Sequence, residues 1–83
     1  MGIYELGRQI AKFAYDVGDL YELRDVYESY EQMETETIIG LCQKTERKGI
    51  AKWLQDVYYD ASANNEAEVC ERAQKLYGEV VAI

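Results

Sequence analysis

Apolar side chains recur every three or four residues at the start of the chain, which is the spacing of one face of an α-helix. This spacing predicts a helix over residues 3–17, with these core-facing positions: Ile3, Leu6, Ile10, Phe13, Ala14 and Val17. Gly18 can adopt the left-handed conformation that ends a helix, and Asp19 can cap a following one, so we expect a second helix over residues 20–33. Gly7 either permits a close helix crossing or has no structural role.

The middle of the chain predicts two further helices. A polar break is expected at residues 34–37, followed by a third helix over residues 36–48 that ends at Gly49. Its predicted inward positions are Ile38, Ile39, Leu41 and Cys42. A fourth helix is expected over residues 50–61, with Trp53 as its core anchor or, alternatively, as a dimer contact. A single glycine is a weak stop signal, so one bent helix stays open as the alternative to two.

Residues 62–65 form the clearest loop signal, and a fifth helix is expected over residues 66–80. Asn65 and Glu68 have the spacing of a capping pair at its start. The predicted fold is therefore all-α: a compact bundle of four to five short amphipathic helices joined by tight turns. At 83 residues the chain has room for one domain, so residues 1–83 are expected to form a single helical domain.

The formal net charge is −7, and it is concentrated in one segment. Residues 13–43 contain eight acidic side chains and one basic side chain, Arg24, which is a net charge of −7. Such a segment repels nucleic-acid phosphates and attracts a basic protein, so direct nucleic-acid binding is not expected. A solvated helix face without a partner is the plainer interpretation of the same charges.

Tyrosine is abundant, and four of its side chains are predicted to face outward. Exposed tyrosines are enriched at protein interfaces, because they supply contact area together with a hydroxyl group. Combined with the acidic row of the second helix, they give the predicted partner-binding set: Asp19, Tyr21, Glu22, Asp25, Glu28, Tyr4, Tyr15 and Tyr59.

The residue types required for most enzyme chemistry are missing from the sequence. Histidine is absent, which removes the commonest general base and metal ligand. No glycine-rich phosphate loop occurs, and neither Cys42 nor Cys70 belongs to a zinc-binding pattern. Both cysteines are predicted to face the core, with a disulfide or a reactive thiol as the alternative. We expect no enzymatic activity, no catalytic residues, no cofactor and no metal.

No apolar run approaches the length of a membrane helix, and no signal segment precedes the first helix, so we expect a cytoplasmic protein without membrane contacts. The predicted function is a small acidic protein-binding module. In its sharper form it is an inhibitor that mimics nucleic acid and occludes a partner's basic surface, as small viral or mobile-element inhibitors do. The alternative is an assembly module that forms a homodimer or larger homo-oligomer. There, the acidic second helix would pair with a basic patch: Lys44, Arg47, Lys48 and Lys52.

Overall fold

The computed structural model describes residues 1–17 and 29–83, and all of its regular elements there are α-helices. They are α1 (Ile3–Val17), α3 (Tyr30–Cys42), α4 (Lys44–Ala63) and α5 (Ala67–Val81). The all-α prediction is confirmed, and α1 has the predicted bounds. The predicted helix of residues 20–33 falls mostly outside the described residues.

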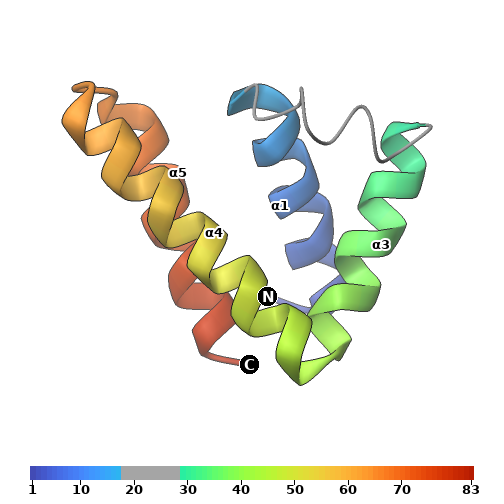
Figure 1. Cartoon of the computed structure of the whole chain (residues 1–83). Helices are drawn as coiled ribbons and strands as arrows, with labels where there is room; N and C mark the ends of the chain where they lie inside the picture. Colours follow the sequence, from blue (N-terminus) through green and yellow to red (C-terminus); the bar gives the residue numbers. More distant parts are fainter. Residues whose placement is uncertain (18–28) are drawn as a thin grey trace.

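Helices α1 and α3 run antiparallel and lie side by side (Figure 1). Gly7 makes this close approach possible. A Cβ atom at Gly7 would lie 3.2 Å from Ile38 Cα and 3.3 Å from its backbone nitrogen, and would clash with Cγ1 of the same side chain. Of the two roles open for Gly7 in the sequence, the structure therefore supports the close crossing.

The predicted polar break at residues 34–37 is wrong, because α3 runs through it without interruption. The helix begins where Ser29 Oγ accepts a hydrogen bond from the Gln32 backbone N–H at 3.2 Å. Inside the helix, the Thr37 hydroxyl donates to the Met33 carbonyl at 2.8 Å, so a threonine that resembled a break is accommodated in the helix.

The predicted inward face of this segment is also partly wrong. Leu41 is buried and Ile38 is half-buried, but Ile39 is 44% exposed and Cys42 is exposed. The buried residues of α3 are Met33, Gly40 and Leu41, of which only Leu41 was predicted. Because residues 30–42 form one helix and not two, the buried face is set by α1 and α4 together, and Cys42 falls outside it. Cys70 is half-buried, and both cysteines are free thiols.

The boundary between α3 and α4 lies at Gln43, whose backbone is extended, and not at Gly49. Gly49 is an exposed residue inside α4, so the predicted helix end there is wrong. The alternative of one helix across Gly49 holds for residues 44–61, but the break at Gln43 separates residues 36–42 from it. Gly40 lies close to α4 just before the turn. A Cβ atom at Gly40 would lie 3.1 Å from Glu46 Oε2 and 3.3 Å from Ile50 Cδ1.

Helices α4 and α5 form a hairpin, and their joining turn differs from the predicted one (Figure 1). Asn65 takes a left-handed conformation with φ of 57°, which asparagine tolerates better than most residues. The Glu66 N–H donates to the Ala61 carbonyl at 2.9 Å, and the Asn65 N–H donates to the Ser62 carbonyl at 3.3 Å. This is a Schellman motif that ends α4. Residue 66 caps α5 without a side-chain hydrogen bond, so the predicted Asn65–Glu68 pair is absent.

All four described helices contribute to one hydrophobic core. Its buried members are Leu6, Ile10, Phe13, Leu41, Leu54, Val57, Ala73, Leu76 and Val80. Trp53 is partly buried against this core and meets Phe13 edge to face, with ring centroids 6.0 Å apart. The tryptophan therefore joins α4 to α1 from the margin of the core.

Candidate functional site

Most of the predicted partner-binding residues lie outside the part of the chain that the structure describes. These are Asp19, Tyr21, Glu22, Asp25 and Glu28. Their proposed role therefore rests on the sequence alone.

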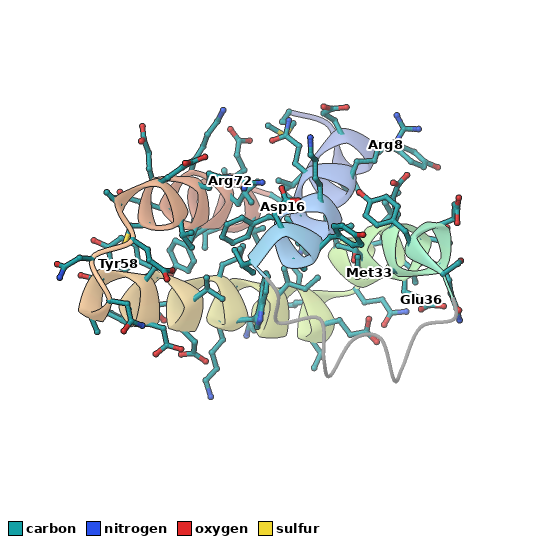
Figure 2. All side chains as sticks on the ribbon, turned by 90° about the horizontal axis from the view of Figure 1, so that it is seen from above. Arg8, Asp16, Met33, Glu36, Tyr58 and Arg72 are labelled. Carbon is teal, nitrogen blue, oxygen red and sulfur yellow. The ribbon has the colours of Figure 1, made fainter. Side chains whose placement is uncertain are left out.

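The other three predicted residues, Tyr4, Tyr15 and Tyr59, are 74%, 48% and 62% exposed, as expected. The structure does not bring them together. Tyr4 lies in the first turn of α1 and Tyr15 in its last turn, while Tyr59 belongs to α4 and stacks edge to face on Tyr58 at 5.6 Å. Tyr58 lies at the end of α4 that is remote from Met33 and Glu36 of α3 (Figure 2). Only Tyr15 reaches α3.

Tyr15 pairs with Tyr30, the first residue of α3. The rings of Tyr15 and Tyr30 meet edge to face at 5.7 Å, and Tyr30 is 36% exposed. This contact joins the last turn of α1 to the start of α3. Two partly exposed aromatic rings thus form one contact surface, a typical anchor of protein interfaces.

Two carboxylates, Glu34 and Asp16, lie near Tyr30. Partial burial, and then the nearby charges of Glu34 and Asp16, raise the pKa of Tyr30 above its ordinary value. Glu31, the next residue in α3, is exposed and has no ion pair among the described residues. We call the group Tyr15, Asp16, Tyr30, Glu31 and Glu34 the tyrosine-pair surface.

Two of its acids are partly neutralised by arginines from other positions. Arg72 Nη2 of α5 lies 3.0 Å from Asp16 Oδ2 (Figure 2). Arg8 Nε of α1 lies 3.3 Å from Glu34 Oε1. The sequence could not have identified either pair, because each depends on how the helices pack. The acidic segment therefore presents less free negative charge here than its composition predicts.

An open groove of about 560 Å³ adjoins this surface on the outer side of α1. Its lining residues come from α1, α3 and α5: Glu5, Arg8, Gln9, Lys12, Tyr30, Glu34, Arg72, Lys75 and Leu76. Bases outnumber acids in this list, although the chain as a whole is acidic. Lys12 and Lys75 have no ion pair within the described ranges. The groove therefore has the opposite polarity to the surface that the sequence predicts for partner recognition.

Among residues 1–17 and 29–83, no three Cys, Asp or Glu side chains are grouped closely enough to hold a metal ion. In the same ranges no helix combines the length and the apolar composition that crossing a bilayer requires. Comparison with family models finds no match, and comparisons with curated proteins and with solved structures find none either.

Proposed function

We propose that this protein is a small acidic protein-binding module that docks on a basic partner through the tyrosine-pair surface. The observation that carries the proposal is the exposed Tyr15–Tyr30 pair among carboxylates. The rings supply apolar anchorage, and the carboxylates steer a cationic surface toward it. The role is one of binding and includes no enzymatic step.

The acidic sequence between α1 and α3 supports the same partner chemistry. Residues 18–28 contain four acids and one base, a net charge of −3, and they connect directly to the helix ends that carry Tyr15 and Tyr30. In the sharper form of the proposal, the partner's basic surface is one that otherwise holds nucleic acid, and the module occludes it as an inhibitor.

Two matched pairs of variants test this function. A partner is first captured from native lysate at low salt, identified and purified. Its affinity for the wild type is then measured at low and at high salt. We expect Glu31→Lys and Tyr15→Ser each to weaken binding about tenfold, since loss of an anchor residue costs 1 kcal/mol or more. Glu68→Lys and Tyr4→Ser make the same chemical changes at other exposed positions, and should change the affinity less than twofold.

The salt response and a competition experiment complete the test. Affinity for the partner should fall as salt rises, and a nucleic-acid duplex should compete with the module for the partner. Equal losses in both members of either matched pair, or an affinity that is indifferent to salt, would refute docking through the tyrosine-pair surface. Binding without nucleic-acid competition would refute only the inhibitor form.

A further inference from the structure

Helix α4 carries an ordered row of charges on its exposed side. Lys48, Lys52, Asp56 and Asp60 follow one another at four-residue intervals, and all four are exposed. Residues at this spacing form one of the surface ridges by which helices pack. The row exists only because residues 44–63 are one uninterrupted helix, with Gly49 inside it (Figure 1).

The order of the charges makes this row complementary to itself. When two copies of α4 lie antiparallel, Lys52 can face the partner's Asp56 while Lys48 faces the partner's Asp60. A two-fold axis repeats both pairs, so all four side chains meet an opposite charge. A parallel arrangement would place bases opposite bases. None of the four side chains has an ion pair within the described residues, so all are available for such contacts.

The same register also matches the shapes of the two helices. It places Tyr59, which is 62% exposed, opposite the partner's Gly49. A Cβ atom at Gly49 would have no neighbour within 4 Å, so the space beside this glycine is open. Thr45 and Ala63, both exposed, would oppose each other near the ends of the contact. Small residues opposite an aromatic ring allow two helices to approach closely.

We propose that α4 forms a weak antiparallel homodimer with α4 of a second copy, held by these charge pairs and by Tyr59. A 20-residue helix is about 30 Å long, and one helix–helix contact of this length buries less than the roughly 1,200–2,000 Å² of a stable interface. The dimer should therefore have a dissociation constant in the micromolar range and depend on salt. It uses a different face from the tyrosine-pair surface, so the two proposals stand or fall separately.

Sedimentation velocity over a range of protein concentrations tests the dimer, using two charge-reversed variants. In K48E/K52E the row becomes entirely acidic, and in D56K/D60K it becomes entirely basic. Each variant alone should stay monomeric under conditions in which the wild type dimerises. An equimolar mixture of the two variants should form a heterodimer that is tighter than the wild-type dimer. In it, every acidic side chain of one row faces a basic side chain of the other row, which also offsets the repulsion between like charges within each row.

Further variants serve as controls. Glu68→Lys with Glu71→Lys changes the net charge as D56K/D60K does, but on α5, and should leave the dimer in place. Exchanging all four charges, with Lys48 and Lys52 changed to Asp and Asp56 and Asp60 changed to Lys, should restore self-association. Circular dichroism confirms that each variant is folded.

A wild type that is monomeric at high micromolar concentration in low salt would overturn the proposal. A dimer that both reversals leave intact would overturn it as well, because another face would then hold the copies together. Failure of the mixture to associate would contradict pairing between the charged rows of two copies.

Discussion

Gly7 illustrates how one residue can serve packing at the expense of local helix stability. Glycine inside a helix costs about 1 kcal/mol relative to alanine, so helix propensity alone would favour replacement. The backbone of Ile38 lies too close to accommodate the added methyl group.

We therefore expect Gly7→Ala to lower the free energy of unfolding by about 1–3 kcal/mol, the usual cost of overpacking. Urea denaturation measures the change. Gly78→Ala in α5 is the matched control, because a Cβ atom at Gly78 would have no neighbour within 4 Å. This substitution should stabilise the protein by up to about 1 kcal/mol. Stabilisation by both substitutions would show that α1 and α3 do not cross closely at Gly7.

Tyr30 should make the stability of the protein depend on pH in the alkaline range. Its pKa is raised in the folded state by partial burial and by the charges of Glu34 and Asp16. The unfolded chain ionises near the ordinary tyrosine pKa of about 10. The stabilising contribution is therefore complete below pH 10 and is lost as the pH rises through the raised pKa.

We expect Tyr30→Phe to reduce the loss of stability between neutral pH and pH values above 10. Urea denaturation across this range compares the variant with the wild type, and ultraviolet titration of phenolate should show the loss of one tyrosine that ionises above the ordinary pKa. Tyr4→Phe, at a highly exposed tyrosine, is the control and should keep the wild-type alkaline profile. Identical alkaline profiles for Tyr30→Phe and the wild type would contradict the raised pKa.

At the scale of elements, Arg72 connects α5 to α1 by two interactions. Its guanidinium group lies 4.9 Å from the centre of the Phe13 ring and 3.0 Å from the Asp16 carboxylate. The ion pair is partly solvated and is worth about 0.2–1 kcal/mol. The stacking over Phe13 requires the planar guanidinium group, which lysine lacks.

We expect Arg72→Lys to destabilise the protein by about 0.5–1 kcal/mol although the charge is kept, and Arg72→Ala by about 1–2 kcal/mol. Lys75→Ala, at an exposed position one turn further along α5, should stay within about 0.5 kcal/mol of the wild type. Thermal and urea unfolding measure all three. If high salt abolished the difference in stability between the wild type and Arg72→Ala, the stacking of Arg72 over Phe13 would contribute nothing to stability.

Helix boundaries show where local patterns stop being informative. The range of α1 was predicted correctly, and that of α5 to within one residue, because their apolar positions repeat regularly from end to end. The segment of α3 and α4 was divided wrongly at residues 34–37 and at Gly49. There the threonines and Gly49 lower the local preference for helix by about 1 kcal/mol or less. The packing of Leu41, Leu54 and their neighbours in the core stabilises the observed helices by more than that.

At the scale of the whole molecule, a single core joins all the described helices, so they should unfold together. Leu6 is fully buried in this core. Leu6→Ala should cost about 2–5 kcal/mol, a large part of the roughly 5–15 kcal/mol that stabilises a domain.

The expected result is a fall of about 10 °C or more in the melting temperature, because 1 kcal/mol corresponds to roughly 4–8 °C in a domain of this size. Circular dichroism and the fluorescence of Trp53 should report the same transition. Gln74→Ala on the exposed side of α5 should leave the melting temperature nearly unchanged. Separate transitions for the two signals would show that the helices do not share one core.

The sequence by itself determined the all-α class, the buried face and bounds of α1, the position of α5 and the exposure of Tyr4, Tyr15 and Tyr59. These properties follow from side-chain spacing within one helix, which is local information. Only the tertiary structure decided the turn at Gln43, the exposure of Cys42, the pairing of Tyr15 with Tyr30 and the neutralisation of Asp16 and Glu34 by arginines. Each of these depends on contacts between residues distant in the chain, whose free energy of packing exceeds the local preferences that the sequence pattern records.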